Sequence, residues 1–321
     1  MSALARRASR KFTTVRLAIH FVLCVALLGS SHASNSHASH SKRDRASTSG
    51  QLVFVANVAD NWDIFVARAD GSSCFQLSET RYDENFPSLS PDRTKVAYGA
   101  TDGKLRIVDV RTRGVVVIPQ LEQTRSEIQP AFSPDGERIA FVAFESGMTD
   151  DSDLAMFDTR SWKSKIFHKQ RSAQFFPNWS PEGNQIVYVN VHCSSECGRI
   201  IDELWTAQTH RTLARQILMT NSQCMQPDWS PDGEKIVFAS DMAGNFDVWV
   251  YDLKSQGLKR LTEDPAPDTD PCWSPDGQRI AFTSTRSGMT EIFVMDKNGK
   301  NVEAFRPFGE RRIECRNPNW K

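Results

Sequence analysis

The sequence predicts an all-β fold, a β-propeller of six four-stranded blades, and three observations lead to this prediction. The phrase Ser-Pro-Asp-Gly or a close variant recurs five times, at Ser90, Ser133, Ser180, Ser230 and Ser274. The steps of 43 to 50 residues between these serines match the length of one four-stranded blade. Each copy is followed by short apolar runs of the kind that form strands.

The four-residue phrase is itself a turn signal. Serine suits the first position, proline presets φ at the second, and glycine at the fourth supplies the positive φ that a type I turn with a bulge requires. The copy that begins at Ser90 has Arg93 in place of the glycine. Because apolar residues flank the phrase on both sides, the unit is predicted to be strand, turn, strand.

The last repeat shows all four strands of a blade. Its first strand is the Pro-x-Trp run that ends at Trp273, and its second strand is predicted at 280–283. A polar, Gly-containing hairpin at 285–290 leads to a third strand at 291–296, and a fourth follows near 302–305.

The other repeats follow the same order along the chain. The second and third strands are predicted at 95–99 and 105–109 in blade two, 138–143 and 153–158 in blade three, and 185–190 and 203–207 in blade four. Blade five is predicted to cover 229–252, with an outer strand near 258–261.

The first blade lacks its own Pro-x-Trp strand. Three strands are predicted at 51–56, 62–67 and 75–77, but the missing phrase stands at the other end of the chain, as Asn317-Pro-Asn-Trp320. We therefore predict that the C-terminal strand completes the N-terminal blade. This arrangement closes residues 50–321 into a ring of six blades with protected edges.

Residues 1–33 have the layout of a secretory signal peptide. A basic start is followed by an apolar stretch at 17–28 and by Ser31-His32-Ala33, a small-x-small cleavage pattern. Export to the periplasm or the extracellular space is predicted, and an uncleaved N-terminal membrane anchor is the alternative. Residues 34–49 are rich in Ser and His without apolar periodicity, so we expect a disordered linker.

The balance of charged residues argues against one class of partner. The chain has 39 basic and 39 acidic residues, but five of the basic residues lie in the predicted signal peptide, at positions 6, 7, 10, 11 and 16. The mature protein is therefore mildly acidic, which argues against nucleic acid. The mature chain is also predicted to have no membrane span and to be a monomer.

One candidate site follows from the phase of the repeat. The residues three positions before the repeat prolines are equivalent in all six blades: Glu84, Glu127, Gln174, Cys224, Asp268 and Cys315. At the start of the innermost strands they should circle one mouth of the central channel. Glu84, Glu127, Gln174 and Asp268 could then hold Ca²⁺ or attract a basic partner segment. The alternative is a solvated acidic rim.

The repeat resembles the propeller of a known family. Pro-x-Trp-Ser-Pro-Asp-Gly-x-x-Ile-Ala-Phe, followed by Gly-x-x-x-Ile-Phe-Val-x-Asp, is similar to the propeller domain of the TolB family and covers residues 50–321. The resemblance implies a six-bladed propeller, which in prolyl-oligopeptidase-like relatives stands beside a hydrolase domain. The separate N-terminal α/β domain of TolB itself is missing from this sequence.

Motifs for catalysis are missing from the sequence. G-x-S-x-G, H-E-x-x-H and the Walker loop do not occur, and His168, His192 and His210 lie in different phases of the repeat. We therefore predict a non-catalytic module that binds an envelope protein or peptide, or a glycan. The alternative is a polysaccharide lyase or hydrolase with a metal or acid-base site at the channel mouth.

Cysteine and tryptophan carry two further predictions. Six cysteines remain after the signal peptide, and Cys193 and Cys197, which bracket one hairpin, are the candidate disulfide. Cys224 and Cys315 are equivalent but lie two blades apart, so a bond between them is not expected. The tryptophans of the repeat are predicted to pack between blades rather than to form a carbohydrate platform.

Overall fold

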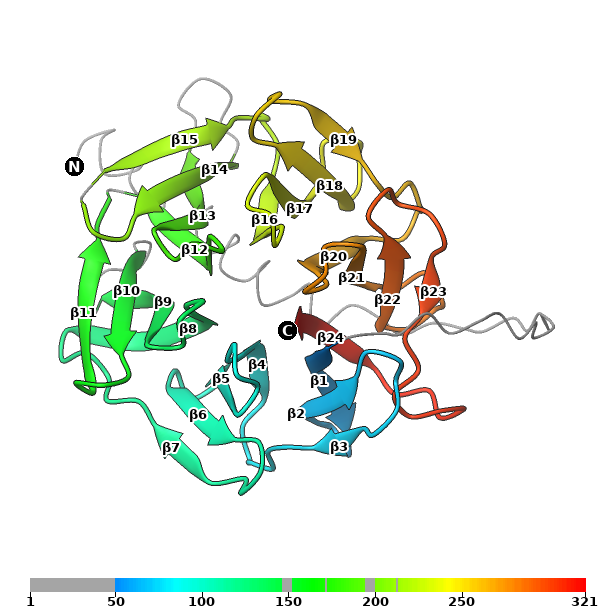
Figure 1. The fold of residues 1–321 in the computed structure, drawn as a ribbon, viewed down its shortest axis with the longest axis horizontal. Helices are drawn as coiled ribbons and strands as arrows, with labels where there is room; N and C mark the ends of the chain where they lie inside the picture. The colour runs from blue at the N-terminus through cyan, green and yellow to red at the C-terminus, as the bar shows by residue number, and fades with distance from the viewer. Residues whose placement is uncertain (1–49, 146–151, 171, 194–199, 212) are drawn as a thin grey trace, which may run out of the picture.

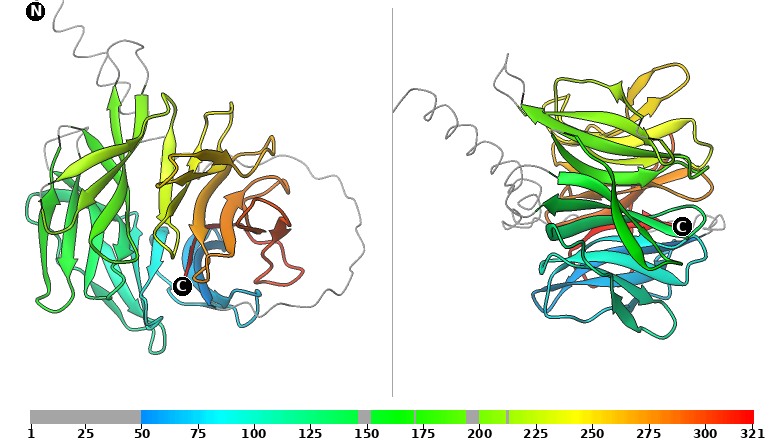
Figure 2. Two further views of the ribbon diagram at one scale, coloured as in Figure 1. Left: turned by 45° about the horizontal axis from the view of Figure 1, so that its top comes forward. Right: turned by 90° about the vertical axis from the view of Figure 1, so that its left-hand side faces the viewer.

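The computed structural model describes residues 50–145, 152–170, 172–193, 200–211 and 213–321. They form six four-stranded antiparallel sheets around a central channel (Figure 1), which confirms the predicted fold class. Two further views show the sheets side by side around the ring (Figure 2). The described residues include no helix long and apolar enough to cross a membrane.

From the channel outward, the strands of each blade are consecutive in the chain, except that the innermost strand of blade one is the last strand of the chain. Blade one contains β24 (Cys315–Trp320), β1 (Gln51–Val58), β2 (Asn61–Arg68) and β3 (Phe75–Gln76). Blade two contains β4 (Glu84–Leu89), β5 (Lys95–Ala100), β6 (Leu105–Asp109) and β7 (Val115–Val117). Blade three contains β8 (Thr124–Phe132), β9 (Arg138–Glu145), β10 (Ser152–Asp158) and β11 (Lys163–His168).

The remaining blades repeat this order. Blade four contains β12 (Ala173–Trp179), β13 (Gln185–Cys193), β14 (Ile200–Gln208) and β15 (Ala214–Leu218). Blade five contains β16 (Cys224–Trp229), β17 (Lys235–Ser240), β18 (Asp247–Asp252) and β19 (Leu258–Arg260). Blade six contains β20 (Asp268–Trp273), β21 (Arg279–Ser284), β22 (Glu291–Asp296) and β23 (Glu303–Ala304).

Ring closure occurs in blade one, as the sequence predicted. β24 pairs with β1 through Leu52 opposite Trp320 and Ala56 opposite Cys315. The amide of Gln51 donates to the carbonyl of Lys321 at 2.7 Å, so the two ends of the propeller are held by backbone hydrogen bonds. Figure 1 shows β24 beside β1, with the C-terminus near the centre of the ring.

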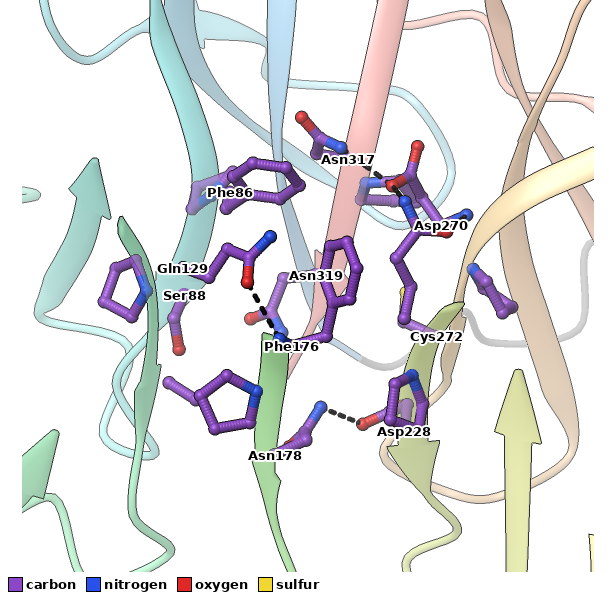
Figure 3. Close-up of a pocket in the computed structure, with 18 of the residues that line it drawn as sticks. Phe86, Ser88, Gln129, Phe176, Asn178, Asp228, Asp270, Cys272, Asn317 and Asn319 are labelled. Carbon is purple, nitrogen blue, oxygen red and sulfur yellow. Dashed lines mark hydrogen bonds between the residues drawn. The ribbon is translucent and has the colours of Figure 1, made fainter. Parts of the chain in front are cut away.

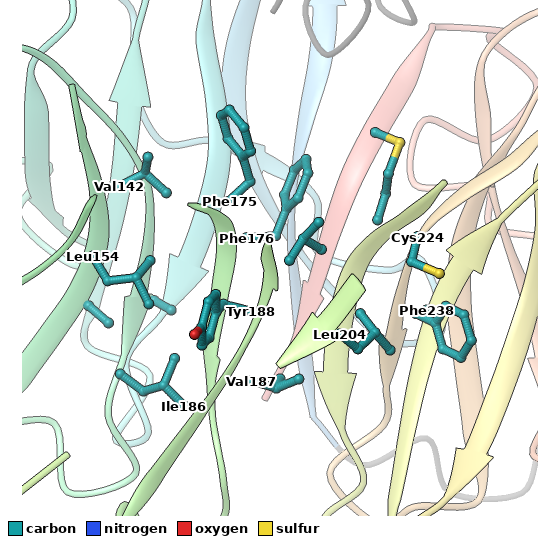
Figure 4. Close-up of a cluster of buried hydrophobic side chains, with 14 of the residues drawn as sticks. Val142, Leu154, Phe175, Phe176, Ile186, Val187, Tyr188, Leu204, Cys224 and Phe238 are labelled. Carbon is teal, nitrogen blue, oxygen red and sulfur yellow. The ribbon is translucent and has the colours of Figure 1, made fainter. Parts of the chain in front are cut away.

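The cores lie between neighbouring blades, where each sheet buries both of its faces. The cluster in Figure 4 joins blades three, four and five and includes Tyr188 and Phe238, both fully buried. The repeat tryptophans are also buried: Trp179, Trp229, Trp273 and Trp320. Trp179 Nε1 donates to the carbonyl of Ala131 in the preceding blade at 2.9 Å, which confirms the predicted packing role.

The Ser-Pro-Asp-Gly turns adopt the predicted conformation. In the turn after β8, the amide of Gly136 donates to the carbonyl of Ser133 at 2.9 Å, and Gly136 has a φ of 72°. In the first copy of the turn, Arg93 occupies the same left-handed region, with a φ of 61°. A side chain with a Cβ is strained there, so this turn costs more than its glycine copies.

Replacement of this arginine provides a test of that strain. We expect Arg93→Gly to raise the free energy of unfolding by about 1 kcal/mol, because glycine adopts a positive φ without steric cost. Thr94→Gly, one residue further along the same turn, is the matched control and should destabilise the protein. Chemical denaturation of both variants measures the difference, and a loss of stability in Arg93→Gly would contradict the assignment of strain.

Candidate functional site

A cavity of about 110 Å³ lies in the central channel, between the six innermost strands. Its lining includes the residue immediately before each repeat proline: Phe86, Gln129, Phe176, Gln226, Asp270 and Asn317. We name these six residues the channel ring. Figure 3 labels all of them except Gln226, together with neighbouring residues of the channel wall.

All six channel-ring residues share one unusual backbone conformation. Their φ values lie between 50° and 56°, although none is glycine. At the same point of each innermost strand, the pairing with the second strand shifts register, for example between Asn85 and Ser88 in β4. A bulge of this kind re-aims a side chain, and strained backbone tends to gather at functional sites.

The bulges free backbone N–H groups, and side chains of the neighbouring blade accept them. Gln129 Oε1 accepts from the amide of Phe176 at 2.8 Å, and Gln226 Oε1 accepts from the amide of Asp270 at 3.0 Å. One layer further along the channel, Asp228 Oδ2 accepts from the amide of Trp273 at 2.7 Å. Side chains at the channel therefore link each of these blades to the next.

The channel ring is apolar on one side and polar on the other. Phe86 and Phe176 meet edge to face, with ring centroids 5.9 Å apart. Asn317 Nδ2 donates to Asp270 Oδ1 at 2.8 Å, and Gln226 Nε2 donates to the same oxygen. The channel therefore combines an aromatic surface with a carboxylate.

Two aspartates line the cavity, and both have perturbed pKa values. Burial raises the pKa of Asp228, against the opposing effect of the Lys321 ammonium group. Burial also raises the pKa of Asp270, although the hydrogen bond from Asn317 and the charge of the nearby Arg316 favour its charged form. A charged group held in a cleft with a shifted pKa is a candidate binding site.

The structure places the four residues of the predicted rim between blades. Glu84, Glu127, Gln174 and Asp268 are all fully buried, and none of them belongs to the cavity lining. Burial raises the pKa of Glu84 and of Glu127. Among the described residues, no group of three or more His, Cys, Asp or Glu is placed to hold a metal ion.

Hydrogen bonds show what these four side chains do. Glu84 Oε2 accepts from the amide of Ile64 at 3.2 Å, and Gln174 Oε1 accepts from the amide of Leu154 at 3.2 Å, in each case from the preceding blade. Glu127 accepts from the amide of Leu121, and both oxygens of Asp268 accept from Arg286. These contacts are structural, and the Ca²⁺-binding role stays a prediction.

The structure describes some of the cysteines but not the predicted disulfide pair. Cys224 and Cys315 are free and buried, and Cys74 is free and partly exposed. Cys197 and the side chain of Cys193 lie outside the described residues, so the predicted disulfide stays a prediction. Residues 1–33 and 34–49, the predicted signal peptide and linker, also lie outside them.

The phase of the repeat was predicted correctly, but the channel-ring residues that line the cavity stand two positions after the four predicted ones. A residue before proline favours extended backbone, and side chains alternate along a regular strand. The bulge breaks this alternation and directs the side chain of the residue before the proline toward the channel. The signal available in sequence was the set of large or polar side chains at this one position in all six repeats.

Two faces of the ring differ in their loops. The turn face carries the Ser-Pro-Asp-Gly turns, which are nearly identical in sequence, and the short turns between third and fourth strands, such as 110–114 and 253–257. The hairpin face carries the connections between second and third strands and those into the next blade, among them 101–104, 219–223 and 305–314. The amide of Thr101 donates to the carbonyl of Asp83 at 2.9 Å, so these two kinds of connection are in contact.

The fold and its central channel define a closed six-bladed β-propeller whose last strand completes the first blade. The chain belongs to the PD40 family, the TolB beta propeller domain, whose sequence model matches residues 149–316, just over half of the chain. The family that the sequence resembles is thereby confirmed.

Individual relatives are similar over part of their length. A protein named "Protein TolB homolog" from Chlorobium luteolum is 29% identical over 161 residues, which are 49% of this chain and 35% of the relative. The chain thus spans about a third of that protein. TolB from Acinetobacter baumannii has a similar structure, with a TM-score of 0.71 and 19% identity over 86% of this chain and 67% of that one.

Propellers with other activities share the fold. An oligogalacturonate lyase solved in complex with manganese has a TM-score of 0.56 and 17% identity, over 79% of this chain and 73% of that chain. At this level of identity the similarity extends to the fold alone, and the same fold hosts unrelated functions.

Proposed function

We propose that this chain is an exported, non-catalytic propeller that binds a protein or peptide partner in the cell envelope through its hairpin face. Membership of the TolB propeller family supports this class of function. The apolar stretch and the small-x-small pattern of residues 1–33 support export.

The contrast between the two faces carries the proposal. On the turn face the connections between first and second strands repeat one four-residue phrase, and their aspartates are engaged within the turns, as when Asp135 Oδ1 accepts from the amide of Glu137 at 3.0 Å. The other connections of this face join third and fourth strands through short turns such as 110–114 and 253–257. On the hairpin face the loops differ in length and sequence from blade to blade, from 219–223 to 305–314. Variable loops on a rigid scaffold are where proteins usually bind their partners.

Affinity capture with paired variants tests this proposal. The full chain, with a tag inserted in 34–49, is used as bait in an envelope extract. We expect Arg81→Glu with Arg311→Glu, two exposed positions on the hairpin face, to lower capture of a specific partner at least tenfold. Lys254→Glu with Lys297→Glu, exposed on the turn face, is the charge-matched control and should leave capture unchanged.

Two results would overturn the proposal. One is equal loss of capture in both pairs of variants, because the hairpin face would then have no special role. The other is release of unsaturated products from a polyuronate by the purified chain, which would establish the lyase alternative. Circular dichroism of each variant confirms that any loss of capture occurs in folded protein.

A further inference from the structure

We propose that the channel cavity binds a small organic ammonium ion, with the charged nitrogen at Asp270 and the carbon chain against Phe86 and Phe176. This site is separate from the hairpin face, and it does not depend on the function proposed above. Three observations carry the inference: the size of the cavity, the aromatic pair, and an Asp270 carboxyl group that has no directly bonded cation and is open to the channel.

The cavity has the right size and an asymmetric wall. Its volume of about 110 Å³ is large enough for a few water molecules or a ligand of a few heavy atoms. In Figure 3 the Phe176 ring lies between Gln129 on one side and Asp270 on the other. A ligand beside Phe176 therefore meets an aromatic surface and a carboxylate together.

Asp270 is a carboxyl group without a directly bonded cation. It accepts from the side-chain amides of Gln226 and Asn317 and from the Thr269 hydroxyl, and it forms no ion pair within 4.0 Å among the described residues. The nearby Arg316 guanidinium favours the charged form of Asp270, but it donates to Asn85 and lies 3.8 Å from the centre of the Trp62 ring. Asp270 is also partly exposed to the channel, so a ligand can reach it.

The other aspartate in the cavity is less accessible. Asp228 is 9% exposed, and Asn178 Nδ2 and the amide of Trp273 donate to its two oxygens. A cation lies near each aspartate, since Lys321 favours the charged form of Asp228 as Arg316 does that of Asp270. Asp270 is the more exposed of the two to the channel, so it is the carboxyl group that a ligand reaches.

The aromatic pair completes the site. Phenyl faces attract cations, and they also bury the carbon chain of an alkylammonium ion. Gln129 Oε1 accepts from the amide of Phe176 at 2.8 Å and so holds the backbone that carries this ring.

Calorimetric titration of the full chain with n-butylammonium chloride tests the proposal. We expect saturable binding that 1-butanol, which has the same chain length but no charge, does not show. Asp270→Asn and Phe176→Leu should each weaken binding at least tenfold. Asp60→Asn, an exposed aspartate on the β1–β2 turn, is the matched control and should bind as the parent does.

Each other result overturns the inference. Absence of heat with n-butylammonium, or an affinity that neither variant changes, excludes the site. Saturable binding of calcium chloride without binding of n-butylammonium assigns the cavity to a metal ion instead. If Asp270→Asn does not fold, as judged by circular dichroism, Phe176→Leu alone decides, and an unchanged affinity in that variant rejects the proposal.

Discussion

Deletion of residues 316–321 is expected to unfold the propeller, or to lower its free energy of unfolding by more than about 4 kcal/mol. The deletion removes most of β24 and with it Trp320, which is 2% exposed. It also removes Asn319, whose Oδ1 accepts from the amide of Leu89 in blade two at 2.9 Å. The inner edge of β1 would lose its partner strand, and blade one would lose the contacts that β24 makes with both neighbouring blades.

A single substitution separates loss of packing from loss of the strand. Trp320→Ala should cost about 3–5 kcal/mol, because it leaves a large cavity beside Arg279, whose guanidinium lies 4.7 Å from the centre of the Trp320 ring. Trp162→Ala is the control, since Trp162 is 41% exposed on the turn between β10 and β11. Thermal and urea unfolding measure all three proteins. Unchanged unfolding of the truncated chain would contradict the closure of the ring by β24.

Asp202→Asn is expected to stabilise the protein by about 4 kcal/mol at pH 8 and by much less at pH 4.5. Asp202, in β14, is 6% exposed, and its Oδ1 has no hydrogen-bond partner among the described residues. Burial, followed by the charge of Asp241, raises the pKa of Asp202 to about 7. At pH 8 the folded protein must therefore hold an uncompensated buried charge, which asparagine removes.

The sign of the pH dependence follows from the two states of Asp202. The unfolded chain loses the proton near the ordinary aspartate pKa of 3.8, and the folded protein loses it near 7. Between these values folding takes up a proton at Asp202, so the contribution of this group to the free energy of unfolding falls as the pH rises from about 4 to about 7. In Asp202→Asn this fall should disappear.

Denaturation series at several pH values check this prediction. Asp60→Asn, on an exposed turn, is the matched control and should keep the pH dependence of the parent. An equal effect of Asp202→Asn at pH 4.5 and pH 8 would show that the carboxylate is not held in its neutral form in the folded protein.

Much of the fold was predictable because the repeat encodes it locally. The Ser-Pro-Asp-Gly phrase specifies the turn through the intrinsic conformations of proline and glycine, and short apolar runs specify the strands. The Pro-x-Trp phrase at residues 318–320 revealed the closing strand, since blade one lacked its own copy. Structure and expectation agree in all six blades for this reason.

The candidate site was less predictable because side-chain direction depends on a bulge. Alternation along β4 from Glu84 would place every second residue toward the channel, but the register shift between Asn85 and Ser88 interrupts it. Glu84 is buried between blades, and Phe86, which lies within the shifted stretch and has a φ of 52°, lines the channel. A local pattern of residue types does not reveal such a shift.

The sequence by itself determined the class of fold, the number of blades, their order and the strand that closes the ring. These features depend on turn chemistry and on the period of apolar residues, which are local properties of the chain. Only the tertiary structure decided which side chains reach the channel and which lie between blades. That outcome depends on strained backbone at six equivalent positions, which is held in place by contacts between residues of different blades.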